Sequence, residues 1–332
     1  MILPQTMMYI AVREPGGAEK LQAAQMPVPQ PATGQVLIRV MAVGVNRADL
    51  LQRAGNYPPP AGESDILGLE VSGEIVAIGA DVTAWKKGDV VCALLASGGY
   101  AEYVTAHAAL CLPIPSGVSM IDAAGLPEAA FTAMSNLMLT GQLRAGETVL
   151  IHAGGSGVGT FAIQLAHAIG ARLFTTVGTD EKQDFCRDLG AEIAINYRRE
   201  DFISKIMAAT DGRGVDVILD MIGGATTEKN IGLLATDGRL LLIAYPDGPR
   251  AQLHLPTLLQ KRLHIIGTTL RARPLSQKSA IAAAVKAEVW PLIAAGKIRP
   301  VTYQTLKLTE AAIAHRILES RQHIGKIILT VS

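Results

Sequence analysis

Two different patterns of apolar and polar positions divide the chain. Between residues 27 and 125, short apolar runs such as VLIRVMAVGV (36–45) and VSGEIVAIG (71–79) are separated by Gly and Pro. Runs of that length between turn residues are typical of β-strands. This part of the sequence therefore predicts a β-rich unit.

From about residue 127 the pattern becomes an alternation of apolar strands and helical stretches. Alternation of this kind predicts a parallel sheet with helices on both faces, because a parallel strand is reached only through a crossover connection. The predicted strands are TVLIHA, RLFTTV, EIAINY, DVILDMIG, RLLLIAY and LHIIGT, and the five helices between them include TEKNIGLLA (227–235) and PTLLQK (256–261). Further helices are expected at 279–296 and 309–320, beside short β runs at 301–303 and 326–331. The expected fold class is α/β, with a doubly wound six-stranded sheet beside the β-rich unit.

The first strand of the alternation leads into a glycine-rich turn, HAGGSGVG at 152–159. The dinucleotide-binding pattern G-x-G-x-x-G fits here, with Gly154 first, Gly159 last and Ser156 at the middle glycine. A Walker loop would need a lysine after Gly159, and a nucleophile elbow would need glycine in place of Val158. We therefore expect a pyrophosphate on the backbone N–H groups that open the next helix. Ser156 is expected to cap that helix, to bond a phosphate oxygen, or to do both.

The end of the second strand, VGTDEK at 177–182, favours NADPH over NADH. Enzymes that use NADH place an acid here to bind the ribose hydroxyls, but the first acid is Asp180, which we expect beyond the ribose. Lys182 and the Tyr197 hydroxyl are the candidates to hold the 2′-phosphate of NADPH. The alternative is that Lys182 is a solvated helix residue and Tyr197 packs at a strand end.

Composition narrows the class of protein. Thirty basic against twenty-nine acidic residues give a formal net charge of +1, which does not favour nucleic acid or a membrane surface as the main partner. Cys92, Cys111 and Cys186 are too few and too scattered for a disulfide framework or a metal-binding pair, which favours a reducing, cytoplasmic location. The opening MILPQTMMYIAV lacks the basic region of a secretion signal, and no apolar run is long enough to span a membrane.

Several motifs in a fixed order carry a family resemblance. They are PGGAEKL (15–21), VGVNRADLLQRAGNYPPP (43–60), LGLEVSGEIVAIG (67–79), the glycine-rich turn, INY (195–197) and IGKIIL (324–329). Over nearly its whole length the chain resembles the zinc-independent quinone oxidoreductases related to zeta-crystallin, in the medium-chain dehydrogenase/reductase superfamily. The run NRADLLQRAGNYPPP together with HAGGSGVG is most similar to the stress-inducible quinone oxidoreductase-like branch.

The resemblance implies two domains and a homodimer. A GroES-like catalytic domain is expected from residues 1–126 and 272–332, and a Rossmann NADP-binding domain from 127–271. The cleft between them should hold nicotinamide and substrate. By motif position, the implied cofactor-binding residues are Thr132, Ser135, Gly154, Ser156, Gly157, Val158, Gly159, Gly178, Thr179, Lys182, Tyr197, Tyr245, Thr268, Thr269 and Arg321.

No metal site is expected. Zinc dehydrogenases of the superfamily carry a cysteine and a histidine ligand where this chain has Asn46 and Leu69, and the three cysteines cannot build the four-cysteine structural lobe. Without a Lewis acid, an unactivated ketone or alcohol is a poor substrate. The absence of zinc ligands therefore favours an activated acceptor such as a quinone.

The candidate catalytic residues are Asn46, Asp49 and Tyr57. Asn46 could orient a carbonyl or the nicotinamide ribose, Asp49 could fix Asn46 or Arg47, and Tyr57 could donate a proton or stack on the acceptor. Alternatively, the first two bond backbone in a turn and Tyr57 only packs its loop. Glu70 is expected to anchor a buried turn, and His152 to be structural.

The function expected is NADPH-dependent reduction of quinones by hydride transfer. Two alternatives stay open: reduction of α,β-unsaturated carbonyl compounds, in which a group such as Tyr57 must protonate carbon, and a non-catalytic cofactor-binding role.

Overall fold

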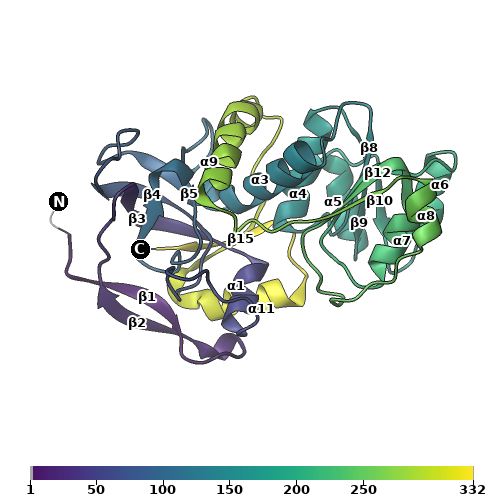
Figure 1. Cartoon of the computed structure of the whole chain (residues 1–332). Helices are drawn as coiled ribbons and strands as arrows, with labels where there is room; N and C mark the ends of the chain where they lie inside the picture. Colours follow the sequence, from purple (N-terminus) through teal and green to yellow (C-terminus); the bar gives the residue numbers. More distant parts are fainter. Residues whose placement is uncertain (1–2, 332) are drawn as a thin grey trace. The chain divides into compact units, whose positions relative to one another are not determined.

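A computed structural model describes residues 3–331, in two compact units (Figure 1). Unit 1 contains the residues up to 131, together with 271–294 and those from 300 onward, and unit 2 contains 132–270 and 295–299. The domain limits inferred from the sequence remain predictions, and residues 1, 2 and 332 of those domains lie outside the described residues.

Unit 1 is built on a seven-stranded sheet and a two-stranded one. The large sheet has the order β14-β15-β3-β4-β5-β7, with β6 paired to β3, and β1 pairs with β2 in the small one. The strands are β1 (Thr6–Val12), β2 (Leu21–Pro27), β3 (Gln35–Val45), β4 (Glu70–Ile78), β5 (Val90–Leu94), β6 (Tyr103–His107), β7 (Cys111–Pro113), β14 (Thr302–Lys307) and β15 (Lys326–Thr330). Strand β15, near the end of the chain, lies antiparallel to β3.

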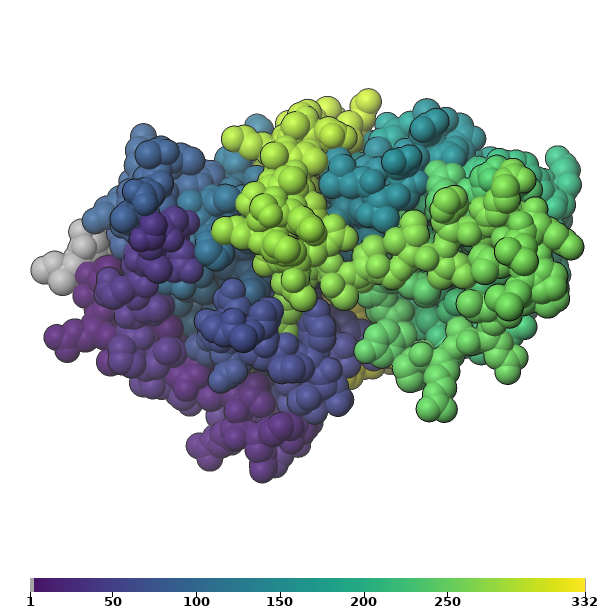
Figure 2. All heavy atoms as spheres, in the orientation of Figure 1, coloured from purple at the N-terminus to yellow at the C-terminus, as the bar shows by residue number. Residues whose placement is uncertain are grey.

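Helices pack around these sheets. They are α1 (Arg47–Arg53), α2 (Met120–Ala123), α3 (Pro127–Ala133), α9 (Leu275–Ala284), α10 (Trp290–Ala294) and α11 (Ala311–Ser320), with single turns η1 (Ala18–Lys20), η2 (Ala108–Leu110) and η5 (Leu308–Glu310). The helix predicted at 279–296 contains a π-helical segment, η4 (Val285–Val289), between α9 and α10. Figure 2 shows α9, in yellow-green, on the surface of the unit.

Unit 2 is the doubly wound domain that the alternating pattern predicts. All neighbours in its six-stranded sheet are parallel, in the order β10-β9-β8-β11-β12-β13, with helices on both sides (Figure 1). The strands are β8 (Thr148–Ile151), β9 (Arg172–Val177), β10 (Ile193–Asn196), β11 (Val215–Asp220), β12 (Leu234–Leu242) and β13 (His264–Gly267). The helices are η3 (Met134–Thr140), α4 (Gly157–Ala168), α5 (Asp180–Asp188), α6 (Phe202–Ala209), α7 (Thr226–Leu233) and α8 (Leu255–Gln260).

The sequence places the boundary between α7 and β12 incorrectly. The predicted helix continued to 235 and the strand was expected at 239–245, but the helix ends at Leu233 and β12 begins at Leu234. A register shift opposite β11 and a left-handed Asp237 interrupt the strand, so a turn-like sequence lies inside it. The residues at this irregularity, Thr236, Asp237 and Gly238, are typical of a loop, but the backbone stays in the sheet.

Each unit has its own apolar core. In unit 1 the buried side chains include Ile38, Val71, Val91 and Ile327, and in unit 2 they include Leu150, Phe174 and Ile218. Within residues 3–331 no helix is both long and apolar enough to cross a bilayer.

Candidate functional site

The glycine-rich turn joins β8 to α4, as the fingerprint requires. Ser156 has φ −76°, and its Oγ accepts a hydrogen bond from the Gly159 N–H at 3.0 Å. The Ser156 hydroxyl in turn donates to Met221 Sδ at 3.5 Å. Ser156 thus forms the expected helix cap, and its contact with a phosphate stays a prediction.

Two glycines of this turn have no room for a side chain. A Cβ atom on Gly154 would lie 2.2 Å from Thr175 Oγ1, and one on Gly159 would lie 2.3 Å from the carbonyl oxygen of Ala153. The first distance shows that the turn packs closely against β9. The second shows that the start of α4 packs closely against the turn itself. Because a helix leaves its first N–H groups without intrahelical partners, those at the start of α4 remain donors for an anion.

Lys182 and Tyr197 flank the same loops. A Cβ atom on Gly155 would lie 2.9 Å from Lys182 Cδ, and one on Gly178 would lie 3.1 Å from the Tyr197 hydroxyl. Residues from α5 and from the end of β10 therefore meet at the loops that follow β8 and β9. Thr179 caps α5 by accepting from the Lys182 N–H at 3.3 Å.

The sequence did not single out Arg198, which lies at the same place. Its Nε would be 3.6 Å from a Cβ atom on Gly178. Burial lowers the pKa of Lys182, and the charge of Arg198 lowers it further. Two cations that destabilise each other's charged forms would both be stabilised by a bound anion. A basic residue directly after the INY motif was the available signal.

The Asp180 carboxylate is hydrogen-bonded to two residues at and after the end of β10, and its position relative to a ribose stays a prediction. One carboxylate oxygen accepts from Asn196 Nδ2 at 2.6 Å, and the other pairs with Arg199 at 2.5 Å. This carboxylate is therefore held against the end of β10.

Three further cofactor candidates of unit 2, Tyr245, Thr268 and Thr269, lie at or near the carboxyl ends of later strands. Tyr245, beyond β12, is 68 % exposed, and its Cα would be 2.7 Å from a Cβ atom on Gly223, which follows β11. Thr268 follows β13 and donates to Asn136 Oδ1 at 2.6 Å, while Thr269 beside it is exposed. The carboxyl edge of an open parallel sheet is where such folds bind ligands.

Thr132 and Ser135 lie where α3 changes into the π-helical η3. Both are buried, and the Ser135 hydroxyl donates to the Thr132 carbonyl at 3.3 Å. Asn136, which the sequence did not single out, donates to the same carbonyl at 2.8 Å and links this turn to Thr268. A π-helical turn of this kind is frequent at functional sites.

His152 follows β8 and uses both ring nitrogens within the protein. Nδ1 lies 2.8 Å from Thr176 Oγ1, and Nε2 lies 2.8 Å from Asn230 Oδ1. Burial lowers its pKa. These contacts agree with a structural role.

In unit 1, Asn46 belongs to a buried polar cluster with Glu70 and Lys326. Asn46 Nδ2 donates to Glu70 Oε1 at 2.9 Å and to the Gly44 carbonyl at 3.2 Å, and its Oδ1 accepts from the Lys326 ammonium at 2.7 Å. Both amide hydrogens are thus used, which leaves a single acceptor lone pair for a ligand. That lone pair suits a hydroxyl, such as one of a ribose, better than a carbonyl oxygen.

Glu70 does more than anchor a turn. It begins β4, is fully buried, and pairs with the ammonium of Lys326, while its Oε2 accepts from the Glu128 N–H at 2.8 Å. A Cβ atom on Gly44 would lie only 2.2 Å from Glu70 Oε1, so glycine is required beside this carboxylate. The expectation of a turn anchor was therefore incomplete, because the ion pair with a residue 256 positions away has no local signal.

Asp49 holds the Asn46 backbone and ends a chain of buried hydrogen bonds. Its oxygens accept from the Asn46 N–H at 2.7 Å and from the Gly68 N–H at 3.0 Å. Tyr100 donates to it at 3.4 Å. Burial raises the pKa of Asp49 to about 6, although the backbone donors lower it. Both Asp49 oxygens thus accept from backbone N–H groups, which is the alternative that the sequence left open for this residue, and one of these bonds holds the Asn46 backbone.

The chain of hydrogen bonds runs from Arg53 through His315 and Tyr100 to Asp49. Which atom donates in each bond follows from the chemistry of Arg53. The Arg53 guanidinium only donates, so His315 Nδ1, at 3.1 Å, must be the acceptor. His315 is therefore neutral with its hydrogen on Nε2, which donates to the Tyr100 oxygen at 3.0 Å. Burial lowers the pKa of His315 to about 3, in agreement with this state. The Tyr100 hydrogen is then directed at Asp49.

Tyr57 belongs to a second group in unit 1, around Arg271. The Arg271 guanidinium lies 5.1 Å from the centre of the Tyr57 ring and donates to the Tyr57 carbonyl at 3.1 Å. The same guanidinium donates to Gln52 Oε1 and to the Ala96 carbonyl, both at 2.6 Å. The Tyr57 ring is therefore fixed by a buried cation that the sequence did not single out.

Arg321, which the resemblance also implied as cofactor-binding, caps the C-terminal end of α11 in unit 1 with φ 58°. It lies near Arg47, whose pKa is lowered by burial and then by the Arg321 charge. It is thus outside the unit that holds the glycine-rich turn.

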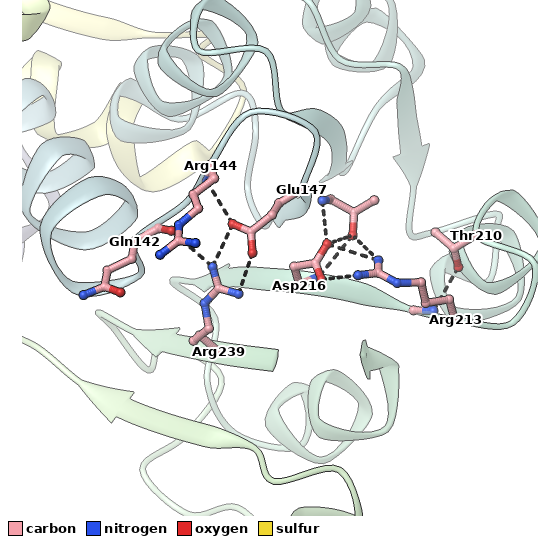
Figure 3. A network of polar contacts seen from close by, with 9 residues as sticks. Gln142, Arg144, Glu147, Thr210, Arg213, Asp216 and Arg239 are labelled. Atoms are coloured by element: carbon pink, nitrogen blue, oxygen red, sulfur yellow. Dashed lines mark hydrogen bonds and ion pairs between the residues drawn. The ribbon is translucent and has the colours of Figure 1, made fainter. Parts of the chain in front are cut away.

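A surface hollow lies at the opposite, amino-terminal edge of the unit 2 sheet. It is lined by Gln142, Arg144, Glu147 and Arg239 (Figure 3). Arg239 donates through both terminal nitrogens to the two oxygens of Glu147 at 2.9 Å. These charges neutralise one another and tie β12 to the start of β8, so the hollow is structural.

Two family models match the chain. The Alcohol dehydrogenase GroES-like domain matches residues 32–116, and Zinc-binding dehydrogenase matches 157–286. The residues present do not fit zinc, because Asn46 is bonded to an ammonium group and Leu69 is an apolar core residue. Within the described residues, no group of three or more His, Cys, Asp or Glu could hold a metal ion.

Known proteins are similar over almost the whole chain. Phthioceranic/hydroxyphthioceranic acid synthase of Mycobacterium tuberculosis is 33% identical over 98% of this chain, which spans only 15% of that protein's length. The structure of Escherichia coli quinone oxidoreductase complexed with NADPH is 31% identical, with a TM-score of 0.85, over 98% of this chain and 100% of the other. CurK enoyl reductase is 27% identical, with a TM-score of 0.87, over 99% and 100%. The chain belongs to the medium-chain dehydrogenase/reductase superfamily, as a member similar to its quinone oxidoreductases.

Proposed function

We propose that this chain is an NADPH-dependent reductase that transfers hydride to a quinone without a metal ion. The observation that carries the proposal is the set of loops at the carboxyl edge of the unit 2 sheet, where the capped glycine turn, Lys182 and Tyr197 meet. Bound there, NADPH would supply the hydride.

The residues of unit 2 match the parts of that cofactor. The free N–H groups of Gly157 and Val158 at the start of α4 would bind the pyrophosphate. Lys182, Arg198 and the Tyr197 hydroxyl would bind the 2′-phosphate, for which cations and a hydroxyl donor are suited. Asp180, the acid that could have favoured NADH, is already paired with Arg199.

A quinone is the preferred acceptor because of what surrounds Asn46. The cluster offers an amide, a carboxylate and an ammonium group, but no ligand set for a Lewis acid. A quinone accepts hydride readily and becomes an aromatic hydroquinone, so it does not depend on a metal to stabilise an alkoxide. The likeness to a quinone oxidoreductase solved with NADPH supports the same choice.

Reduction of an α,β-unsaturated carbonyl compound is the second candidate. This reaction requires an acid that protonates carbon, and unit 1 contains carboxyl groups whose pKa values are raised by burial, to about 6 for Asp49 and about 8 for Glu128. The likeness to CurK enoyl reductase supports this candidate. A non-catalytic cofactor-binding role is supported by no feature of the site.

The acceptor class is tested by NADPH oxidation with quinones, enones and aldehydes, each against the Gly154→Ala variant as a control with a disturbed cofactor loop. We expect steady oxidation with a simple benzoquinone, and little with aldehydes. Faster turnover of enones than of quinones would favour the second candidate. Inactivity with every acceptor would leave only the non-catalytic role.

A further inference from the structure

We propose that Glu128 holds the proton that unit 1 delivers to the reduced acceptor. This inference rests on the proposed function, since it concerns the acid that accompanies hydride transfer. The acceptor gains two electrons and one hydrogen as hydride and therefore carries an added negative charge. Breaking the O–H bond of the Glu128 carboxyl moves a proton to the charged oxygen or carbon, and the carboxylate then recovers a proton from water.

The backbone fixes where the Glu128 side chain starts. Glu128 is the second residue of α3, and its N–H donates to Glu70 Oε2 at 2.8 Å. The other oxygen of Glu70 accepts from Asn46 and pairs with Lys326. Glu128 is thus joined through a single carboxylate to the cluster that contains the candidate residue Asn46.

Three acids belong to this cluster or are hydrogen-bonded to it, Glu70, Asp49 and Glu128, and of these Glu128 is the one available to a ligand. Asp49 and Glu70 are both fully buried, and both oxygens of each already accept hydrogen bonds. The Glu128 side chain is partly exposed. Within residues 3–331 its carboxyl oxygens take part in no hydrogen bond or ion pair, so they can exchange a proton with water or with an acceptor.

Charged groups face Glu128 from several elements. Burial raises its pKa to about 8, and the carboxylates of Glu70 and Asp49 raise it as well, while Lys326 and Arg271 lower it. Lys278 of α9 also faces it, since the Glu128 charge raises the pKa of that lysine against the larger effect of burial. At neutral pH the carboxyl is therefore mostly protonated, as a proton donor must be.

The first test measures the proton itself and needs neither cofactor nor acceptor. In an infrared titration of the protein alone, the carboxylic acid C=O absorption that Glu128→Gln removes should disappear with a midpoint near pH 8. Glu63→Gln is the matched control, because Glu63 is an exposed acid of the same unit that faces Arg271 and Lys278. A midpoint at the ordinary value of 4.5 would overturn the proposal.

The second test measures delivery of that proton. With an enone acceptor, Glu128→Gln should lower kcat by about 10²-fold or more and remove the decline of kcat at alkaline pH. Glu63→Gln should keep both the rate and the decline. If Tyr57→Phe shows the loss and Glu128→Gln does not, the donor is Tyr57 and the proposal is wrong.

Failure of the proposed function has a different result. If the unmodified protein oxidises no NADPH with any acceptor while the infrared midpoint stays near pH 8, the proposed reductase fails and proton delivery by Glu128 fails with it. If the protein is active but Glu128 titrates as an ordinary carboxyl, this inference alone is overturned.

Discussion

We expect two cations, Lys182 of α5 and Arg198 after β10, to decide which nicotinamide cofactor the chain prefers. Replacing Lys182 by alanine removes one of the groups assigned to the 2′-phosphate, which only NADPH carries. We expect the unmodified protein to bind NADPH at least ~10-fold more tightly than NADH, and Lys182→Ala to lose most of that difference. Titration of both cofactors by tryptophan fluorescence or calorimetry measures it.

Arg187→Ala provides the matched control for Lys182. Arg187 lies on the same helix but pairs with Asp184 on an exposed face. Its replacement should leave the preference for NADPH unchanged. Equal affinities of the unmodified protein for the two cofactors would contradict the assignment of the 2′-phosphate site.

The unusual acidity of Glu128 also predicts how stability depends on pH. Because the pKa of its carboxyl rises from 4.5 to about 8, the folded protein holds more protons here than the unfolded chain between those values. The contribution of this group to stability is thus complete below 4.5 and is lost as pH rises through 8. Glutamine carries no such proton. The melting temperature of Glu128→Gln should therefore rise relative to that of the unmodified protein as the pH increases from about 5 to about 9. A melting-temperature difference that stays constant over this range would show that Glu128 titrates normally.

Residues that depend on distant partners are those that sequence reasoning missed. Asn46 and Asp49 could be recognised because they lie together in one motif, and Asp49 reaches the Asn46 backbone three residues away. Lys326 is 280 positions from Asn46, so nothing near either residue shows that they are hydrogen-bonded. Arg271, which fixes Tyr57 from 214 positions away, was missed for the same reason.

The β8–α4 turn contains two neighbouring glycines, Gly154 and Gly155, that differ in the space available for a side chain. A methyl group on Gly154 would meet Thr175 Oγ1 at 2.2 Å and Cys186 Sγ at 3.1 Å, both in the packed interior. A methyl group on Gly155 would meet mainly Lys182, a flexible side chain. We expect Gly154→Ala to cost about 1–3 kcal/mol of unfolding free energy and to weaken cofactor binding, and Gly155→Ala to cost much less.

Chemical denaturation of the two variants measures this difference. Gly155→Ala is also expected to reduce the preference for NADPH, because it displaces Lys182. Equal stabilities of the two variants would contradict the close packing of the turn against β9.

The regular elements were those that the sequence predicts best. The strands β8, β9 and β11 are short, mostly apolar runs between turn residues, and each lies within its predicted segment or extends one residue beyond it. The boundary at Leu233–Leu234 was missed because β12 continues through a turn-like stretch that only its pairing with β11 holds in the sheet. The switch from α9 to a π-helical segment has no signal in an alanine-rich pattern.

At the scale of the whole molecule, we expect a homodimer formed through edges of the unit 2 sheets. Strand β13 ends that sheet, and Leu255 and Leu259 of α8, the helix that precedes β13 in the chain, are 58 % and 74 % exposed. An unpaired edge beside exposed leucines is suited to pairing with a second copy. The mass in solution should be twice 35.0 kDa.

Leu259→Lys should weaken that dimer, since it places a charge beside the edge strand. Leu139→Lys is the control, because Leu139 is 47 % exposed in the same unit but lies on η3. A monomeric mass for the unmodified protein by light scattering would refute the dimer.

Hydride transfer from NADPH to an activated acceptor without a metal can be tested on the purified protein. Zinc content is determined in the purified protein, and NADPH oxidation with benzoquinone is followed before and after prolonged chelation. We predict no stoichiometric zinc and an unchanged rate, because the cluster around Asn46 contains an ammonium group where a metal would need a ligand. One tightly held zinc ion per chain, with activity lost on its removal, would contradict both the metal-free chemistry and the choice of a quinone.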